Sequence, residues 1–491
     1  MLKGSISCVA DGPDSHKVKK ERERVKVRVS IFFDGTLNNM SNVSYSKSKK
    51  SPYSEDIILK DIQEKFNDPD QYSSKYSSPS SYENDYSNIA LLVRVVDTSK
   101  FEYHHCFEPI YREGIGTENS EEDSMLGYAL GQSTTGVRAK VEKSIVEIME
   151  VVKNRTDLAS KKVIIDEFRF DVFGFSRGAA AARHFINQIL NTTYFVTGGL
   201  AMIIKPLKER LNEQGFDIQQ VKVHFAGLFD TVSSVGISGT ALRLSNVKDL
   251  SLNAIGQATS VLHLVAADEH RKNFASTNIK SAPTGKELHL PGVHSDIGGG
   301  YSSPSFEHIK IYDTDDFFIS EGDLEIIEAD IEQLISEGWF DYSDLLHKDG
   351  RRCLLNFEKI REAVNWHGEV FVKRAGREYK GISNYYSRIP LHLMKLEAER
   401  NGMHFVKEKI NNAPEMRLIS DDPTLSQTYN LLEKYLDNPS NQEIWRSAPV
   451  LLELRRNYLH FSACCKKMLN SYAPDGPEYE GNIRKRRVHE G

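Results

Sequence analysis

The pattern of hydrophobic residues predicts four buried strands, each followed by a polar loop. The strands lie in Val25–Thr36, Glu167–Phe175, Val221–Val232 and the first part of Lys286–Tyr301. Their nearly continuous apolar runs are typical of strands that are covered by helices on both faces of a sheet. Because parallel strands end at the same edge of a sheet, we expect the polar residues after them to gather there.

Segments with helical spacing of apolar residues separate these strands. They are Ser87–Val96, Lys140–Asn154 and Ser176–Leu190, and beyond about residue 310 the helical pattern continues in Gly322–Phe340 and Pro390–Met403. Strands that alternate with helices predict an α/β fold, with a mostly parallel sheet flanked by helices. The later helices predict a helical C-terminal region, and no internal repeat is visible.

These patterns divide the chain into four parts. We predict a flexible N-terminus at residues 1–24, an α/β domain at 25–310, a helical region at 311–475 and a flexible tail at 476–491. Residues 41–86 form a polar insertion in the α/β domain, with helical spacing only at Asp56–Phe66. We interpret the insertion as a solvated loop, and the helical region as a lid or membrane-docking module.

Composition excludes several classes of protein. The 491 residues are 39% hydrophobic and 27% charged, which is the ordinary globular range, and a net charge of -6 argues against nucleic acid as a partner. The first 24 residues have no apolar core of a secretory signal, and no later stretch is apolar enough to span a bilayer. We therefore expect synthesis in the cytoplasm. The five scattered cysteines are interpreted as free thiols: Cys8, Cys106, Cys353, Cys464 and Cys465.

The strongest chemical motif is a G-x-S-x-G run that joins a predicted strand to a predicted helix. Gly174 and Gly178 flank Ser176, and small residues continue through Ala179 to Ala182. A serine in a strained strand-to-helix turn needs neighbours without side chains, because the two backbones approach closely. This context predicts a nucleophile elbow of the α/β-hydrolase type, with Ser176 as the nucleophile.

A serine nucleophile needs a histidine base and a carboxylate that orients the histidine. In this fold the acid and then the histidine follow the serine along the chain, and Asp230 and His294 satisfy that order after their strands. Asp296 is the alternative acid, although its closeness to His294 suggests that it shapes the glycine-rich loop. Other candidates suit packing, surface or ion-pair roles better: His224 in a strand, His263 in a helix-like stretch, His270, Asp268 and Glu269.

The oxyanion formed during ester hydrolysis requires two backbone donors. We predict the amide of Arg177 and that of Gly35 or Thr36, after the first strand. Asp34 is expected to shape this turn. A phosphatase of the D-x-D-G-T kind is excluded because Phe32 stands where the attacking aspartate is needed. No segment has the ligand spacing of a zinc site, so we predict neither metal nor cofactor.

One apolar segment follows the elbow helix directly. Tyr194–Ile204 is apolar all round and too short to cross a bilayer. It is either an ordinary buried helix or the wall of a channel for acyl chains, and the sequence leaves both interpretations open.

Six ordered motifs between about residues 25 and 305 carry a resemblance to a known family. They are FFDGTLNN, YREGIGT, FGFSRGAAAAR, FAGLFDTV, ADEHRKNF and PGVHSDIGGGY, with a weaker match at Tyr385–Met394. The chain thereby resembles the α/β-hydrolase family of type VI secretion phospholipase effectors of the first lipase class. The resemblance implies a triad of Ser176, Asp230 and His294, and hydrolysis of acyl esters of membrane glycerophospholipids in the periplasm of a rival bacterium.

The expected function is accordingly an antibacterial phospholipase A secreted by a type VI system. The resemblance also implies a cognate immunity protein and a spike or adaptor protein as partners. Two alternatives remain: a cytoplasmic esterase or thioesterase that acts on a small substrate, and a non-catalytic interaction module on a hydrolase fold. The intact serine, aspartate and histidine candidates argue against the second alternative.

Overall fold

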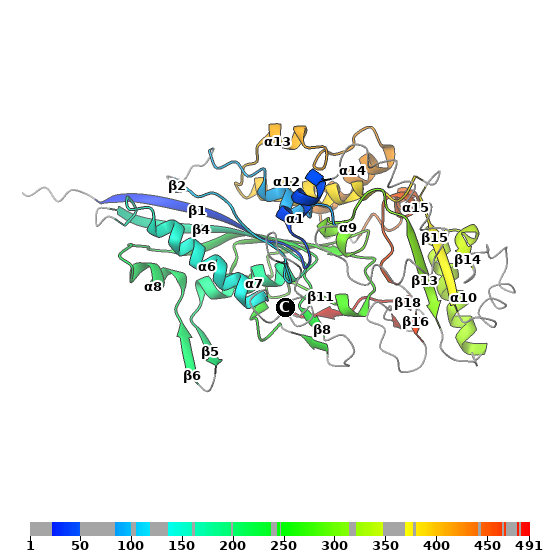
Figure 1. The fold of residues 1–491 in the computed structure, drawn as a ribbon, viewed down its shortest axis with the longest axis horizontal. Coiled ribbons are helices and arrows are strands. Elements are labelled where there is room, and N and C mark those ends of the chain that lie inside the picture. The colour runs from blue at the N-terminus through cyan, green and yellow to red at the C-terminus, as the bar shows by residue number, and fades with distance from the viewer. Residues whose placement is uncertain are drawn as a thin grey trace, which may run out of the picture.

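A seven-stranded parallel sheet forms the centre of the computed structural model (Figure 1). The structure describes residues 22–49, 84–99, 105–117, 136–159, 163–197, 200–236, 243–245, 247–313, 321–346, 369–376, 380–439, 443–463, 466–467, 479–480 and 483–491. The strand order is β12-β10-β7-β4-β1-β2, with β3 also paired to β1, and all of these pairings are parallel. The strands are β1 (Glu23–Phe33), β2 (His105–Cys106), β3 (Ile110–Arg112), β4 (Val163–Phe175), β7 (Val221–Phe229), β10 (Ser260–Ala266) and β12 (Lys286–Leu290).

Side chains on the two faces of the sheet belong to two separate hydrophobic cores. On β1, Phe32 packs into one core while Ile31 and Phe33 pack into the other; on β4, Phe173 and Phe170 divide in the same way. This alternation follows from the pleat of a strand, which sends successive side chains to opposite faces. Continuous apolar runs in the sequence therefore mark strands that are buried on both sides.

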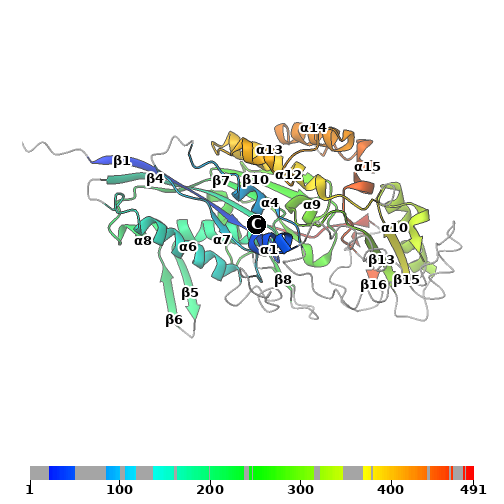
Figure 2. The same cartoon turned by 45° about the horizontal axis from the view of Figure 1, so that its top comes forward.

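Helices cover each face of this sheet (Figures 1 and 2). One face carries α6 (Val137–Lys153), α7 (Arg177–Leu190) and α8 (Leu207–Asn212), and the other carries α4 (Asn88–Val93), α12 (Arg388–Arg400) and α14 (Pro423–Asp437). The predicted α/β-hydrolase-like fold, with a mostly parallel sheet between helices, is confirmed. Since α12 packs on β7 and β10, part of the predicted helical C-terminal region covers the central sheet itself.

A second, smaller sheet lies beyond the end of the central one, beside α10 (Figure 1). Its order is β14-β15-β13-β16. These elements are β13 (Glu307–Asp313), α10 (Glu321–Ser336), β14 (Leu345–Leu346), β15 (Glu369–Arg374) and β16 (Lys466–Lys467). The predicted helical region at 311–475 thus also contains strands, because the short runs around Leu345 and Val372 pair only through contacts that are distant along the chain.

The remaining elements are short. They are α1 (Met40–Lys49), β5 (Thr193–Thr197), β6 (Leu200–Ile204), β8 (Ser234–Gly236), β9 (Arg243–Ser245), β11 (Ser276–Thr277), α9 (His294–Gly298), α13 (Lys407–Asn412), α15 (Val450–Asn457), β17 (Tyr479–Glu480), β18 (Ile483–Arg484) and β19 (Val488–His489). Within the described ranges, no helix has the length and apolar character to cross a membrane. Residues 1–21 and 50–83, with the helix predicted at Asp56–Phe66, lie outside the described residues.

Two predictions of local structure were wrong. Tyr194–Ile204 is the β-hairpin of β5 and β6 rather than a buried helix, and Tyr194 and Ile203 are 75% and 63% exposed. The hairpin projects from the body of the molecule in Figure 1. His263 lies in strand β10 rather than in a helix. Short apolar runs fit a strand as well as a helix, so periodicity alone misassigned both.

The end of the chain also differs from its prediction. Residues 483–491, part of the predicted flexible tail, run alongside the loops that follow the central strands, and β19 pairs with β11. Arg484 is buried and donates from Nε and Nη2 to the carboxylate of Asp330 on α10, at 2.8 and 2.7 Å. The polar composition of this segment by itself predicts a solvated tail. The partners of the segment are distant along the chain, so the local sequence does not reveal them.

Candidate functional site

The candidate nucleophile Ser176 occupies the turn between β4 and α7. Its backbone has φ 59° and ψ -126°, a conformation that costs a residue with a side chain about 1–3 kcal/mol. A Cβ atom at Gly174 would lie 2.5 Å from Ala179 Cα, and one at Gly178 would lie 2.2 Å from the carbonyl oxygen of Asp34. Both glycines are therefore required by close backbone approach, as the G-x-S-x-G pattern predicts.

Backbone hydrogen bonds join this elbow to the loop after β7. The amide of Ser176 donates to the carbonyl oxygen of Phe229 at 3.0 Å, and Val232 N donates to the carbonyl oxygen of Ser176 at 3.3 Å. Asp230 lies between these two positions with φ 41°, and its own amide donates to Leu264 O at 2.7 Å. The candidate acid is thus held by the same backbone network as the candidate nucleophile.

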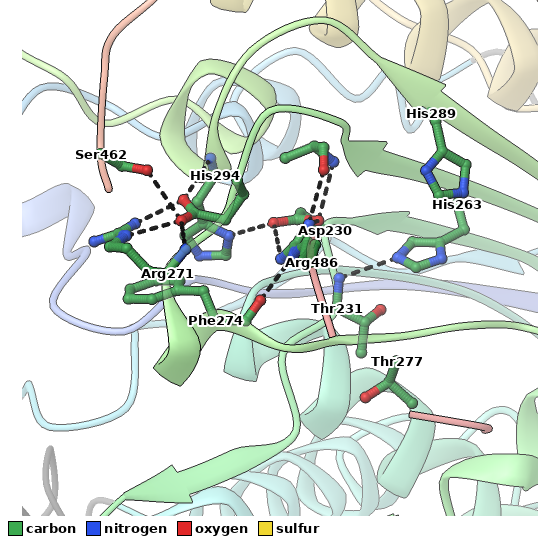
Figure 3. Close-up of polar contacts among 12 residues, drawn as sticks. Asp230, Thr231, His263, Arg271, Phe274, Thr277, His289, His294, Ser462 and Arg486 are labelled. Atoms are coloured by element: carbon green, nitrogen blue, oxygen red, sulfur yellow. Dashed lines mark hydrogen bonds and ion pairs between the residues drawn. The ribbon is translucent and has the colours of Figure 1, made fainter. Parts of the chain in front are cut away.

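His294 reaches Asp230 from the first position of α9 (Figure 3). Its Nδ1 lies 2.6 Å from Asp230 Oδ2, and the two side chains are only 7% and 0% exposed. The imidazole packs against the ring of Phe175, whose centroid is 4.7 Å away, and against that of Phe274 at 4.9 Å. Because Phe175 directly precedes Ser176, the histidine lies beside the elbow, as the motif order predicts.

Burial and nearby charges determine the protonation state and the tautomer of His294. Burial by itself raises the pKa of Asp230, but the charge of Arg486 and the hydrogen bond from His294 outweigh it and hold that pKa far below its usual value. Burial lowers the pKa of His294, against the opposing effect of Asp230. An ionised carboxylate only accepts hydrogen bonds, so Nδ1 carries the proton and Nε2 of the neutral imidazole is left as a base.

Asp230 accepts further hydrogen bonds that the sequence did not predict. Ala266 N donates to Oδ1 at 3.0 Å, while Nη1 and Nη2 of Arg486 donate to Oδ1 and Oδ2 at 2.6 and 2.9 Å. The only signal of Arg486 in the sequence is the basic run from Arg484 to Arg487, which is more typical of a solvated end.

A second histidine supports the loop that contains Asp230. Thr231 N donates to Nε2 of His263 at 3.0 Å, and therefore Nδ1 of His263 donates to Glu287 at 2.9 Å. His263 is completely buried. Its predicted packing role agrees with these contacts, although it packs from a strand.

Asp296, the alternative acid, lies in a different network. Its Oδ1 is 2.7 Å from Nδ1 of His460, whose Nε2 is 2.8 Å from the hydroxyl of Ser305. The other carboxylate oxygen accepts from Val293 N at 3.0 Å and so caps α9. Ser305 lies in an extended bridge to Ile382 rather than at a strand-helix turn. Asp296 thus shapes the loop, as expected, and ties it to the C-terminal region.

Glu269 braces the histidine loop from the other side. It accepts from Nε and Nη2 of Arg271, both at 2.9 Å, from Ser462 Oγ at 2.9 Å and from His294 N at 3.3 Å. Neighbouring Asp268 accepts from Arg455 at 3.0 Å. The predicted ion-pair cluster is therefore present, and two of its contacts reach the C-terminal region.

The loop after β1 lies against the first turn of the elbow helix. Gly35 N donates to Oδ1 of Asp34 at 2.7 Å, and Tyr111 donates its hydroxyl to Oδ2 at 2.6 Å. Burial raises the pKa of Asp34 to about 6, although these hydrogen bonds oppose the shift. The hydroxyl of Thr36 is buried without a hydrogen-bond partner among the described residues. The Gly35 amide is engaged with Asp34, so Thr36 is the candidate of this pair that we carry into the proposal.

The other oxyanion candidate, Arg177, is the first residue of α7. Backbone N–H groups in the first turn of a helix are not used by its internal hydrogen bonds, and they carry the positive end of the helix dipole. In the parts of the chain that the structure describes, no group of three or more histidine, cysteine or acidic side chains is arranged to hold a metal ion.

The hairpin of β5 and β6 is far from this site. It starts after the C-terminal end of α7, whereas Ser176 is at the N-terminal end, and the 14 residues of α7 span about 20 Å. Exposed Tyr194 and Ile203 confirm that this segment is no buried wall. The interpretation of Tyr194–Ile204 as the lining of an acyl channel is therefore wrong.

Part of the chain matches the model of a known protein family. Residues 205–313 match the family model described as T6SS, phospholipase effector Tle1-like, catalytic domain. This range includes Asp230 and His294 but not Ser176. No curated protein matches the chain. The family match confirms the resemblance predicted from the ordered motifs.

Two solved structures are similar over most of the chain. The structure of the Tle1 effector bound to the VgrG spike from the type 6 secretion system is 22% identical, with a TM-score of 0.58 over 96% of this chain and 95% of that one. This similarity establishes a common fold. An uncharacterised protein from Pseudomonas aeruginosa is 17% identical, covers 88% of this chain and 53% of its own, and has a TM-score of 0.35, which is too low to support an argument.

Proposed function

Starting from a catalytic region of the type VI secretion Tle1-like kind, we propose that the protein is a secreted antibacterial phospholipase A. It hydrolyses acyl esters of membrane glycerophospholipids through Ser176, His294 and Asp230. The observation that carries this proposal is the hydrogen bond of 2.6 Å between His294 Nδ1 and Asp230, formed beside a serine with φ 59°. A strained serine, with an oriented neutral histidine packed against the residue before it, fits the arrangement that acyl transfer requires.

The proposed reaction proceeds through an acyl-serine. Ser176 Oγ attacks the ester carbonyl carbon while Nε2 of His294 accepts the hydroxyl proton. The carbon–oxygen bond to the glycerol then breaks, and the imidazolium returns its proton to the departing alkoxide to give the lysophospholipid. Water attacks the acyl-serine with the same histidine as base and releases the fatty acid. The chemistry needs no metal or other cofactor.

The oxyanion of each tetrahedral intermediate is stabilised by the amides of Arg177 and Thr36. One oxyanion donor typically contributes a factor of about 100–1,000 to the rate. Asp34, bound to Tyr111, supports the turn that presents Thr36. Gly178 permits the approach of this turn to the elbow, and Gly174 permits the close approach of β4 to the first turn of α7. Asp296 holds the loop of His294 through its bond to His460.

Delivery and partners are proposed from the similarity to secreted effectors. The related Tle1 effector is bound to a VgrG spike, and we propose that this chain binds a spike or adaptor protein in the same way. A phospholipase that reaches the periplasm of a target cell would also damage sister cells, so a cognate immunity protein is expected. The membrane phospholipid is the substrate, and the site of action is the target-cell periplasm.

Purified protein and vesicles test the enzymatic part of the proposal. Wild-type protein and Ser176→Ala are incubated with glycerophospholipid vesicles that carry distinguishable sn-1 and sn-2 acyl chains, with a chelator present, and with a short water-soluble ester. We expect fatty acid and lysophospholipid from wild type only. Hydrolysis of the soluble ester alone would favour the small-substrate esterase, and no hydrolysis of either would favour the interaction module.

Expression in bacteria tests the site of action. The wild type and Ser176→Ala are each produced with a cleavable export signal and, separately, without one, in a susceptible strain. We expect lysis or arrest only for exported wild type, because only that protein meets the periplasmic face of the membrane in active form. Equal toxicity of the Ser176→Ala variant would contradict the proposal.

A further inference from the structure

Residues 483–491, here called the returning segment, run back to the catalytic loops from the far end of the chain. β19 pairs in parallel with β11, and backbone bonds of 3.0 Å join Ser276 N to Arg487 O and Asn278 N to His489 O. Ser276 follows closely after Phe274, whose ring packs on His294. The returning segment therefore contacts the loop that forms one wall around the proposed base.

Arg486 points from the returning segment to the acid of the proposed triad (Figure 3). Besides its two bonds to Asp230, its Nη1 donates to Ala266 O at 3.0 Å and its Nε donates to Phe274 O at 2.8 Å. The side chain is 7% exposed. The guanidinium thus binds the acid through both oxygens and, at the same time, the backbone of the loop that packs on His294.

We propose that Arg486 is a positioning residue of the active site, which fixes the carboxylate of Asp230 and tunes the basicity of His294 through it. The inference rests on the proposed serine mechanism, since it concerns the same triad. A planar, bidentate cation holds a carboxylate in one orientation more firmly than backbone donors alone. With both oxygens so held, Oδ2 stays directed at His294 Nδ1, and the imidazole keeps the tautomer that leaves Nε2 free to accept the serine proton.

The charge of Arg486 has a second effect. Asp230 favours imidazolium and so opposes the lowering of the pKa of His294 by burial, and without a cation beside the carboxylate this effect would be larger. Arg486 offsets this charge. The charged groups that act on the pKa of His294 are Asp230 after β7 and Glu269 and Arg271 after β10. Asp296 lies on α9 itself, and Arg486 contacts Asp230. Because Glu269 is paired with Arg271, Arg486 is the cation that balances Asp230.

The arrangement of the returning segment distinguishes this role from simple anchoring. Arg484 already anchors the segment through its bidentate bond to Asp330, away from the site. The backbone bonds of β19 anchor it a second time. Replacing Arg486 therefore removes its contacts with Asp230, Ala266 O and Phe274 O, and leaves the two other attachments of the segment in place.

Three variants test the proposal. Arg486→Gln removes the charge, Arg486→Lys keeps it without a planar fork, and Arg487→Gln alters an exposed neighbour of the same type as a matched control. The turnover number kcat is measured on a short soluble ester across pH. The imidazole of His294, one of 16 histidines, is titrated by NMR and assigned by its absence from His294→Gln.

For Arg486→Gln we expect kcat to fall about 10- to 100-fold, by analogy with the losses that follow when the hydrogen-bond partner of a metal-ligating histidine is removed. The pKa of His294 and the acidic limb of the rate profile should both move up by about one unit, because removal of a nearby cation favours imidazolium. Arg486→Lys should have the same apparent pKa in the acidic limb of its rate profile as the wild type, with a several-fold lower kcat. Arg487→Gln should match the wild type.

The inference would be overturned by a folded Arg486→Gln that has the kcat of the wild type and the same apparent pKa in the acidic limb. A lowered kcat with an unchanged pKa of His294 would also overturn it. If Arg486→Gln does not fold, Arg486→Lys decides: a lowered kcat with an unmoved limb supports the inference, and a wild-type kcat overturns it. Should the wild type lack Ser176-dependent hydrolysis, the proposed function fails, while the histidine titration still tests the link from Arg486 to His294.

Discussion

Replacement of Asp230 by asparagine is the perturbation that best separates the two buried aspartates near the histidine loop. The Asp230 carboxylate accepts hydrogen bonds from His294, Ala266 and both terminal nitrogens of Arg486. All of these partners are donors. In either orientation of the introduced amide, its NH2 group faces two of these donors. When the NH2 group faces His294, it donates to Nδ1, and the proton of the neutral imidazole must then lie on Nε2.

The expected loss follows from that tautomer. A histidine that is protonated at Nε2 cannot accept the serine proton, and such a substitution in a serine triad costs about 10,000-fold in kcat, or about 5 kcal/mol of barrier. The unpaired buried donors add a stability cost of about 1–3 kcal/mol each. Arg486 enlarges this cost, because an amide cannot balance its charge.

Asp296→Asn is the matched control. Asp296 is equally buried, accepts from backbone amides and from one histidine, His460, and suffers the same chemical change. Both variants are compared with wild type by kcat on a soluble ester and by thermal unfolding. We expect both to lose stability and only Asp230→Asn to lose about four powers of ten in kcat. Equal losses of kcat in two folded variants, or a larger loss in Asp296→Asn, would refute this assignment of the acid.

Three further results are expected. Since burial lowers the pKa of His294 and the neutral imidazole is the base, activity should fall with decreasing pH only through an apparent pKa below the ordinary value of about 6.5, and a limb well above it in a kcat profile would contradict this. Gly178→Ala should destabilise the protein by about 1–3 kcal/mol and reduce activity, because its Cβ would lie 2.2 Å from Asp34 O; unchanged melting and rate would argue against the close approach. Ile203→Asp should change neither melting temperature nor soluble-ester hydrolysis, as Ile203 is 63% exposed, whereas a loss like that of a core variant such as Ile186→Asp would show that the hairpin is buried in solution.

The central sheet and the elbow could be predicted because their causes are local. Doubly buried strands leave continuous apolar runs, and the close packing of α7 on β4 requires the small residues around Ser176. Asp230 and His294 could be proposed because each comes directly after a strand of a parallel sheet, and strand ends meet at one edge. Their hydrogen bond agrees with that reasoning.

The contacts that could not be predicted all join segments that are distant along the chain. Arg486 meets Asp230 across 256 residues, and His460 meets Asp296 across 164. No periodicity or spacing encodes such pairs. The hairpin at Tyr194–Ile204 was misassigned for a different reason: an apolar composition indicates burial only on average, and here two of its large side chains face solvent.

Covalent labelling identifies the nucleophile of the protein. A long-chain phosphonate that mimics the tetrahedral intermediate of phospholipid hydrolysis is incubated with the protein, and the modified residue is identified by mass spectrometry after proteolysis. We expect one adduct, on Ser176, formed in proportion to the loss of phospholipase activity and absent from Ser176→Ala and from His294→Gln. Inactivation with the label on another serine, above all on Ser305 with its partners His460 and Asp296, would rule out Ser176 as the nucleophile.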